Sequence, residues 1–273
     1  MNRSPDEIAY WLEASEARVN AELYRATAGH PAGPEVVSDD DSATFLLREL
    51  DVGFFNRSVG LGVGRPATEA DLDRVLAMYR DAGLTQYTIQ VSPFARPAAL
   101  EAWLEARGLR RGRRWAKLWR DTDDPPAERT DLRLERIGPE HANDWATVIR
   151  TAFEMPEMLD EVFRVVLGAP GWYHYLAFDG DLAVGAGAMR VLDDVAWFGY
   201  GATLASHRGR GSQSAVFARR IRDARDLGVR LCITETGEET PEEPNPSYRN
   251  MLRAGFRLAY QRQNWLPPKP PEG

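Results

Sequence analysis

Hydrophobic and polar positions in the second half of the chain alternate in patterns that predict strands and helices in a regular order. The apolar run at 195–204 predicts a strand, and the stretch 213–227 has the apolar spacing of a helix. Gly228 is placed to end that helix, and 229–235 predicts the next strand. A short helix ending in "MLRAGF" and a last strand through Trp265 complete this half.

The residues before 204 have the pattern of antiparallel strands. The sequence "YHYLAFDGDLAVGAGAMRVLDDVAWFGYGATL" contains apolar runs separated by two turns, at Asp179-Gly180-Asp181 and at Asp193-Asp194. Such a meander differs from the parallel βαβ unit in which a dinucleotide-binding loop is found.

The first half of the chain repeats this order of elements. It offers a strand in "FFNRSVGLGV", a helix at 68–82 ended by Gly83, a strand in "TQYTIQV", a helix ending in "WLEARGL" and a strand in "GRRWAKLWR". The pair "LEARGL" and "LRAGF", each followed by a basic aromatic strand, suggests two copies of one fold. The charged, Pro-containing segment 120–132 divides them. We therefore expect domains at 1–122 and 130–266 and a disordered tail at 267–273.

Composition limits the kinds of function that the chain can have. Of its 273 residues, 43% are hydrophobic and 27% are charged, which is typical of a globular protein. The formal charge of −7 argues against a nucleic-acid binder, and no apolar run reaches the length needed to span a bilayer. The single cysteine, Cys232, has no disulfide partner, so we expect a cytoplasmic protein. The histidines lack the spacing of metal ligands, so no metal is expected.

The loop after the strand at 195–204 has the chemistry of an anion site. Its sequence is Arg208-Gly209-Arg210-Gly211-Ser212-Gln213. The glycines let the backbone approach a ligand, the first amides of the following helix lack intrahelical partners, and the helix dipole adds positive charge. The two arginines can add charge-assisted contacts to a phosphate. The loop therefore suits a pyrophosphate, although it matches neither the P-loop nor the dinucleotide-binding pattern.

This loop resembles the signature Q/R-x-x-G-x-G/A of the GNAT superfamily of acyl-CoA-dependent N-acyltransferases. Arg208 and Gly211 match the signature, whereas Gln213 stands where a small residue is expected. The stretch "NPSYRNMLRAGF" resembles the second motif of the superfamily, an Asn-led helix that ends in Gly-Phe beneath the pantetheine arm. The resemblance implies an α/β fold of the α+β type. Two GNAT-like domains are expected, each with a mixed, mostly antiparallel sheet flanked by helices.

The resemblance also implies which residues bind the acyl donor, acetyl-CoA. They are residues of the loop and the residue that leads the second motif: Leu204, Arg208, Gly209, Arg210, Gly211, Ser212, Gln213 and Asn245. Two interpretations of Asn245 stay open, because an asparagine before Pro246 is also an ordinary helix N-cap. The arginines have a second interpretation as solvated surface charges.

The resemblance implies direct transfer of the acyl group to an amine within a ternary complex. Members of the superfamily often use as acid a tyrosine four residues before the glycine of Gly-Phe, and that position is Met251 here. Tyr248, one turn earlier, is the predicted substitute, with a packing role as the other interpretation. A base is also needed, because an aliphatic amine is mostly protonated at neutral pH. Glu235 is the candidate, because it lies at the end of a predicted strand where the sheet is expected to splay open. The acidic loop that follows it suits a cationic acceptor or is simply solvated.

We expect the protein to be an acyltransferase, an acetyl-CoA-dependent N-acetyltransferase that acts on an amine of a small molecule or a peptide. The alternative is a CoA-binding sensor or scaffold without catalysis, which Met251 motivates. No nucleic-acid or membrane partner is expected, and the chain is either a monomer or a homodimer. In the first half, Thr68, Glu69 and Asp71 put an N-cap and carboxylates at the matching helix start, which predicts no CoA site there.

Overall fold

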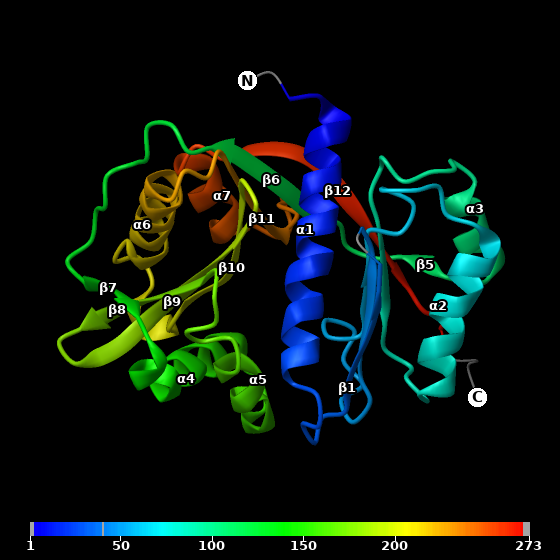
Figure 1. Cartoon of the computed structure of the whole chain (residues 1–273), viewed down its shortest axis with the longest axis horizontal. Helices are drawn as coiled ribbons and strands as arrows, with labels where there is room; N and C mark the ends of the chain where they lie inside the picture. The colour runs from blue at the N-terminus through cyan, green and yellow to red at the C-terminus, as the bar shows by residue number, and fades with distance from the viewer. Residues whose placement is uncertain (1–2, 40, 270–273) are drawn as a thin grey trace. The chain divides into compact units, whose positions relative to one another are not determined.

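The computed structural model describes residues 3–39 and 41–269, and Figure 1 shows their helices and strands. Two compact units divide the chain. Unit 1 consists of Met1–Lys117 together with Ala259–Gly273, and unit 2 consists of Leu118–Leu258. No helix in the described ranges is long and apolar enough to cross a membrane.

Unit 1 has a mixed sheet with helices on both of its faces. Its elements are α1 (Pro5–Ala26), β1 (Pro34–Ser38), β2 (Ala43–Leu47), β3 (Arg57–Val59), α2 (Glu69–Asp81), β4 (Thr88–Val91), α3 (Leu100–Ala106), β5 (Arg110–Arg111) and the parts of β6 (Trp115–Asp121) and β12 (Arg257–Leu266) that fall within it. Strands β1, β2 and β3 are antiparallel neighbours, β4 runs parallel to β3, and β12 pairs antiparallel with β4. In Figure 1, α1 lies on one face of these strands, and α2 and α3 lie on the other.

Buried charges hold α1 against the sheet of unit 1. Glu13 and Glu16, on the buried face of the helix, are both completely inaccessible. Arg262 on β12 donates to both carboxylates, and Lys117 Nζ lies 2.7 Å from Glu16 Oε2. Burial raises the pKa of Glu16, but the charges of Arg262 and Lys117 outweigh burial and hold this pKa well below its usual value. Because an unpaired buried carboxylate is costly, the cations on the strands fix the position of α1.

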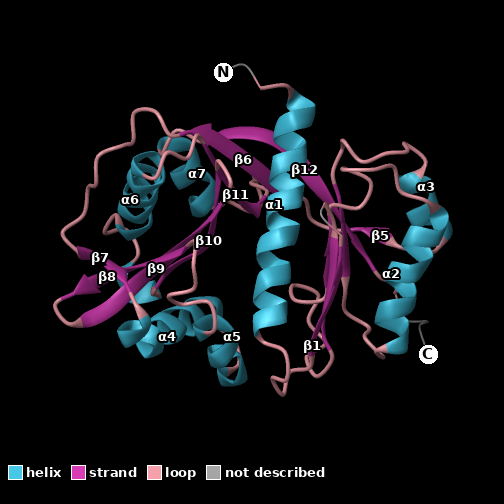
Figure 2. Ribbon diagram, viewed as in Figure 1, coloured by secondary structure: helices cyan, strands magenta, loops and turns pink. Residues whose placement is uncertain are grey.

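Unit 2 contains a mixed sheet between two pairs of helices, and it includes Leu118–Asp121 of β6 and Arg257–Leu258 of β12. Its elements are β7 (Arg133–Ile137), α4 (Ala142–Phe153), α5 (Asp160–Arg164), β8 (Trp172–Asp179), β9 (Leu182–Leu192), β10 (Val195–Thr203), α6 (Ser212–Asp226), β11 (Leu231–Gly237), α7 (Pro246–Arg253) and short 3₁₀ turns at Pro139–His141, Glu157–Leu159 and Ala205–His207. Strands β7 to β10 are antiparallel in sequence order, and β11 is parallel to β10. Figure 2 shows α6 and α7 on one side of these strands, and α4 and α5 on the other.

The predicted fold class and most predicted elements are confirmed. Helix α6 and strand β10 lie within one residue of the predicted ranges, and β11 begins two residues later than predicted. Phe217, Ile221 and Ala224, whose spacing predicted α6, are all buried. Strands β1 and β2 were not predicted. Each has five residues, and β2 is buried throughout, so it lacks the alternation that marks a half-buried strand.

The predicted strand in "FFNRSVGLGV" is wrong in its extent. The structure limits the strand to Arg57–Val59. Gly60 and Gly62 have φ angles of 82° and 83°, which turn the chain out of the extended conformation.

The compact units also differ from the expected domains, 1–122 and 130–266. Ala259–Gly273 belongs to unit 1, where β12 pairs with β4 and buries Trp265 in the core. Leu118–Asp121, the end of the predicted first half, belongs to unit 2. Of the expected disordered tail, Pro267 is held by a hydrogen bond from Arg110 Nε (3.1 Å), and 270–273 lie outside the described residues.

Candidate functional site

The loop between β10 and α6 ends in a helix N-terminus without a side-chain cap. Helix α6 begins at Ser212, and its N-cap position is Gly211, which has a left-handed backbone with φ 81°. Within 3–39 and 41–269, no protein acceptor takes the backbone amides of Ser212, Gln213 and Ser214. These amides and the helix dipole therefore leave a positive pole at the start of α6.

The two glycines of the loop serve different purposes. A Cβ atom at Gly211 would lie 2.3 Å from the carbonyl oxygen of Arg129, so the segment before β7 packs directly against the loop. The Thr130 hydroxyl donates to the Arg210 carbonyl over 2.7 Å and strengthens this contact. Gly209 has φ 84°, but nothing lies within 4 Å of a Cβ atom built there. Gly209 is thus needed for its backbone conformation, and Gly211 for conformation and space.

The two arginines of the loop differ in their partners. Arg210 Nη1 lies 2.6 Å from Asp179 Oδ2, and Arg210 Nη2 donates to Asp131. Hydrogen bonds to these carboxylates raise the pKa of Arg210, which ties the loop to β8 and to the segment before β7. Arg208 is exposed, and its guanidinium has no acceptor in the part of the chain that the structure describes. Of the two predicted phosphate ligands, Arg208 is therefore the one whose side chain is available.

Leu204 and Ser212 turn their side chains into the protein. Leu204 packs against a small apolar cluster around Val184 and donates its amide to the Val184 carbonyl over 2.9 Å. Ser212 is 2% exposed, and its hydroxyl faces Gly185, where a Cβ atom would lie 2.1 Å from Ser212 Oγ. Ser212 can therefore offer a ligand only its backbone amide, and Leu204 supports the loop by packing.

Gln213 joins α6 to α7. Its Nε2 donates to Ser247 Oγ over 2.9 Å, and its Oε1 accepts a hydrogen bond from Asn250 Nδ2. The Nε2 atom lies 3.7 Å from the Cβ position of Gly201 on β10, so the amide group lies over this strand between the two helices. The long side chain at this signature position thus has partners on α7, and the backbone amide stays at the start of α6.

Strands β10 and β11 separate after a short parallel ladder. They pair up to Phe198 and Thr234, and the pairing then stops, although β10 continues to Thr203 and β11 to Gly237. The register of β10 with β9 also shifts between Gly199 and Ala202. The edge of β10 that faces β11 is thus left without a strand partner over its last residues in the described ranges.

Side chains stabilise the point of separation. The Thr234 hydroxyl donates to the Phe198 carbonyl over 3.0 Å, and Arg220 Nη1 donates to the Gly199 carbonyl over 3.2 Å. Two successive carbonyls of β10 are therefore satisfied by side chains at the place where the backbone of β11 moves away.

Asn245 caps α7 and connects it to the end of β11. Its Oδ1 accepts hydrogen bonds from the amides of Ser247 and Tyr248, at 3.0 and 3.2 Å. Its Nδ2 donates to Thr236 Oγ1 (3.1 Å) and to the Gly237 carbonyl (2.6 Å). The side chain thus uses its donors and acceptor within the protein, as the capping interpretation requires. Its predicted contact with CoA stays a prediction.

The predicted base and acid lie on the two elements that border the separated strands. Glu235 follows Thr234 on β11, directly after the last residue paired with β10, and is half-buried. Tyr248 is the third residue of α7 and is also half-buried. Met251 lies one turn later on the same face and is only 4% exposed. The acidic loop between these elements is partly ordered by its own contacts, since Glu239 pairs with Arg249 at 2.8 Å.

The described ranges contain no group of three or more His, Cys, Asp or Glu side chains that could hold a metal ion. His174 is buried between the rings of Trp145 and Trp172, at 4.7 and 5.7 Å between ring centroids. Burial lowers the pKa of His174 to about 4, so its ring is neutral at neutral pH. This histidine belongs to the aromatic core under α4.

The matching helix start in unit 1 is closed by its own side chains. The Thr68 hydroxyl accepts from the Asp71 amide (3.2 Å), and the Asp71 carboxylate accepts from the Thr68 amide (2.8 Å). Arg65 pairs with the same carboxylate at 2.9 Å and holds the pKa of Asp71 well below its usual value. The predicted N-cap is confirmed, and the arginine of this loop is already paired.

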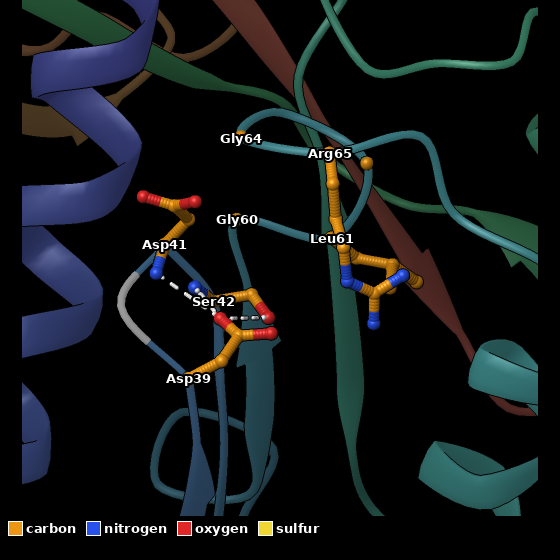
Figure 3. Close-up of a pocket in the computed structure, with 8 residues that line it drawn as sticks. Asp39, Asp41, Ser42, Gly60, Leu61, Gly64 and Arg65 are labelled. Atoms are coloured by element: carbon orange, nitrogen blue, oxygen red, sulfur yellow. Dashed lines mark hydrogen bonds between the residues drawn. The ribbon is translucent and has the colours of Figure 1, made fainter.

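Carboxylates also line the small pocket beside this loop (Figure 3). Its cavity of about 10 Å³ is lined by Asp39, Asp41, Ser42, Gly60, Leu61, Gly62, Gly64 and Arg65. Asp39 Oδ1 accepts hydrogen bonds from the Asp41 and Ser42 amides at 3.0 and 2.7 Å. A Cβ atom at Gly64 would lie 2.0 Å from Asp41 Oδ2, so this carboxylate occupies the space beside the glycine loop. Negative charge here disfavours a pyrophosphate.

The sequence matches no protein-family model and no curated protein. The fold, in contrast, is that of solved GCN5-related N-acetyltransferases (GNAT proteins). One from Kribbella flavida superimposes with a TM-score of 0.64 at 19% identity, over 94% of this chain and 96% of that chain. One from Sphaerobacter thermophilus gives 0.61 at 15% identity, over 97% and 93% of the two chains. A tandem GNAT protein from the clavulanic acid biosynthesis pathway gives 0.59 at 18% identity, over 95% and 93%.

These similarities confirm the resemblance in fold that the two sequence motifs predicted, and the tandem GNAT structure is consistent with two GNAT-like domains. Thr234 and Arg220, which stabilise the separation of β10 and β11, were not among the predicted site residues. One feature of the sequence could have pointed to Arg220. This residue follows Phe217 by three residues and precedes Ala224 by four, which places a charged residue on the apolar face of α6.

Proposed function

We propose that the protein transfers an acetyl group from acetyl-CoA to an amine, directly within a ternary complex. The observation that carries the proposal is the uncapped start of α6 at the end of β10, on the strand that separates from β11. These two features together suit a ligand with a pyrophosphate and an extended arm. The similar solved structures are described as N-acetyltransferases, and this supports acyl transfer in general.

The contacts of the loop suggest how the acyl donor is held. In this proposal, the pyrophosphate accepts hydrogen bonds from the amides at the start of α6 and from the guanidinium of Arg208. The arm follows β10 beyond Phe198, where its amide groups can bond to the strand edge as a neighbouring strand would. Arg210, Gln213 and Asn245 act indirectly, because their side chains hold the loop and α7 in place.

Acyl transfer also requires two proton movements. The amine loses a proton, its nitrogen forms a bond to the thioester carbon, and the carbon–sulfur bond breaks with its electron pair on sulfur. The sulfur then takes up a proton. We assign the first proton to Glu235 and the second to Tyr248, because these side chains lie on β11 and α7, at the two borders of the strand separation.

The acceptor in this proposal is an amine of a small molecule or a peptide. A CoA-binding sensor or scaffold without catalysis is the second candidate. It is favoured by Met251, which is buried at the position where related proteins often have a tyrosine acid. Unit 1 would have no donor site, because the start of α2 is capped by Thr68 and Asp71.

Calorimetric titration with acetyl-CoA tests the binding part of the proposal. We expect one acetyl-CoA per chain and no binding by the double variant Arg208→Ala/Gly211→Asp, which removes a cation and adds a carboxylate. Two equivalent sites, or unchanged affinity in the double variant, would contradict the proposed site. Release of free thiol in the presence of a panel of amines then separates the enzyme from the sensor, because the sensor binds acetyl-CoA without turnover.

A further inference from the structure

A buried cation lies at the point where β10 and β11 separate, and the function proposed above does not use it. Arg220 is on α6 and is 1% exposed. Its Nη1 donates to the carbonyls of Ala188 on β9 (2.8 Å) and Gly199 on β10 (3.2 Å), and its Nε donates to Val216 (3.3 Å). Gly199 is the last residue of β10 before its register with β9 shifts.

Arg220 carries its charge into the protein interior without a carboxylate partner in the described ranges. Its Cζ lies 4.6 Å from the ring of Phe198 and 4.7 Å from the ring of Phe217. The titratable groups that face it are Tyr175 on β8 and Cys232 on β11, and burial raises the pKa of both, so both are neutral. Burial lowers the pKa of Arg220 to about 9, which still leaves the guanidinium charged at neutral pH.

The residues around the Arg220 guanidinium do not neutralise its charge. The carboxylate of Asp223, one turn later on α6, accepts from the Tyr175 hydroxyl (2.8 Å) and pairs with Arg219 (3.0 Å). Gly187 on β9 provides the space, because a Cβ atom there would lie 3.1 Å from Arg220 Cζ. The positive potential of Arg220 is therefore uncompensated along the adjacent part of β10.

Arg220 lies at the level that the acyl end of the donor would reach on its proposed path. Strand β10 and helix α6 flank the loop at 204–211 in the chain, and Arg220 on the helix contacts Gly199 on the strand. Arg220 lies eight residues into α6 from Ser212, about 12 Å along the helix axis. Gly199 lies four residues before Thr203, about 13 Å along the strand. An arm that starts at the loop and follows β10 brings its acyl end toward the level of these two residues.

We propose that Arg220 is a positioning residue for acyl transfer: it fixes the Gly199 carbonyl at the strand separation and supplies the positive charge that stabilises negative charge formed there. The proposal rests on the acyl-CoA function proposed above. In that reaction, negative charge develops first on the thioester oxygen and then on the departing sulfur. Arg220 transfers no proton and stays charged throughout, so it acts through its potential and through the shape of β10.

The thiol of bound CoA gives a direct measure of this potential. The ultraviolet absorbance of the thiolate, followed during a pH titration, should show a pKa for bound CoA about one unit below that of free CoA, a tenfold shift in the ionisation constant. Arg220→Met, which removes the charge at similar length, should return this pKa to the value of free CoA. Arg220→Lys should keep it low. The matched control is Arg222→Met, since Arg222 is also on α6 but is only half-buried and is paired with Glu128.

Turnover provides the second readout. Arg220→Met should lower kcat by about 10- to 100-fold and leave KM for acetyl-CoA within about threefold, because the charge acts on the transition state. A thiol of wild-type-bound CoA that titrates like free CoA would overturn the proposal, and so would wild-type kcat in a folded Arg220→Met variant. If that variant does not fold, the wild-type titration and the Lys variant decide. Failure of the proposed function has a different signature, namely no CoA binding by the wild-type protein.

Discussion

The carbonyl oxygen of Arg129 lies 2.3 Å from the place that a Cβ atom of residue 211 would occupy. The φ angle of 81° at Gly211 adds strain for any other residue. We therefore expect Gly211→Ala to displace the loop, to cost about 2 kcal/mol of folding free energy and to abolish CoA binding. Thermal denaturation and calorimetric titration measure the two effects.

Gly209→Ala is the matched control for this prediction. Residue 209 has a similar φ of 84°, but a Cβ atom there meets nothing within 4 Å. The variant should cost about 1 kcal/mol from backbone strain alone and should retain measurable CoA affinity. If both substitutions reduced stability and CoA affinity equally, the contact with Arg129 would not explain the requirement for glycine at position 211.

Arg208→Ala should weaken acetyl-CoA binding by at least about tenfold, because it removes a charge-assisted contact to phosphate. Arg210→Ala should weaken binding less, since the Arg210 guanidinium is occupied by Asp131 and Asp179. Titrations of both variants at two salt concentrations test this order. A larger loss in Arg210→Ala would mean that Arg210 leaves its carboxylate partners to bind the ligand.

Gln213→Ala should affect stability more than binding. The variant loses the hydrogen bonds to Ser247 and Asn250, together worth about 1–3 kcal/mol, but keeps the backbone amide at the start of α6. Urea unfolding should show the loss, and acetyl-CoA affinity should stay within about threefold. Ser247→Ala removes one of the two bonds and should show a smaller loss. Strongly reduced affinity with unchanged stability would assign the Gln213 side chain to the ligand instead.

Glu235→Gln and Tyr248→Phe should each lower turnover by about 10²- to 10⁴-fold, as is typical of a group that transfers a proton. Acetyl-CoA affinity should be nearly unchanged, because neither residue belongs to the loop before α6. Glu242→Gln, at an exposed position of the acidic loop, is the control and should keep wild-type turnover. Steady-state kinetics with the best amine of the panel gives the comparison. Wild-type turnover in both variants would place proton transfer on other groups.

We expect the buried His174 to make the folded protein less stable in acid. Its pKa is about 4 in the folded protein, because burial disfavours the charged ring, and about 6.5 in an unfolded chain. The unfolded state therefore binds a proton as the pH falls below about 6.5, whereas the folded state does not until about pH 4. Above pH 6.5 the ring is neutral in both states, and His174 does not lower the free energy of unfolding. As the pH falls from 6.5 to 4, the free energy of unfolding decreases by up to about 3 kcal/mol.

His174→Phe should flatten this part of the pH profile. Urea unfolding at about pH 7 and about pH 4.5 provides the measurement. Trp172→Phe is the control: it disturbs the same aromatic contact but leaves the histidine, so the slope should persist. A wild-type slope in His174→Phe would show that other groups cause the acid sensitivity.

The glycine loop before α6 could be predicted as local structure because its signals lie close together in the sequence. Glycines with positive φ and the helix that follows them occupy one short stretch of sequence, and the apolar spacing of α6 extends directly from it. The roles of the polar side chains could not be predicted in the same way. Arg210 pairs with Asp131 and Asp179, and Gln213 with residues of α7, so both partnerships depend on how distant segments pack.

The exact end of the pairing between β10 and β11 could not be predicted either. A separation beside Glu235 was expected, but the sequence does not indicate that the ladder ends at Phe198 and Thr234, because the length of a ladder depends on the register and geometry of both strands. The buried Arg220 was overlooked for a related reason. A charged residue on an apolar helix face has a meaning only when its carbonyl acceptors on β9 and β10 are known.

Because most of β12 belongs to unit 1, the chain cannot be cut between its two halves without removing part of the first unit. A break in the segment 120–132 would separate unit 1 from β12, and with it from Trp265 in its core. Glu13 would remain on the buried face of α1 without Arg262 and Tyr260, the two residues of β12 that bind its carboxylate. A fragment ending near residue 125 should therefore fold only when the remainder of the chain is supplied with it. The two halves, although similar in sequence order, are not interchangeable modules, and recombination at the linker would leave an unneutralised acid in the interior.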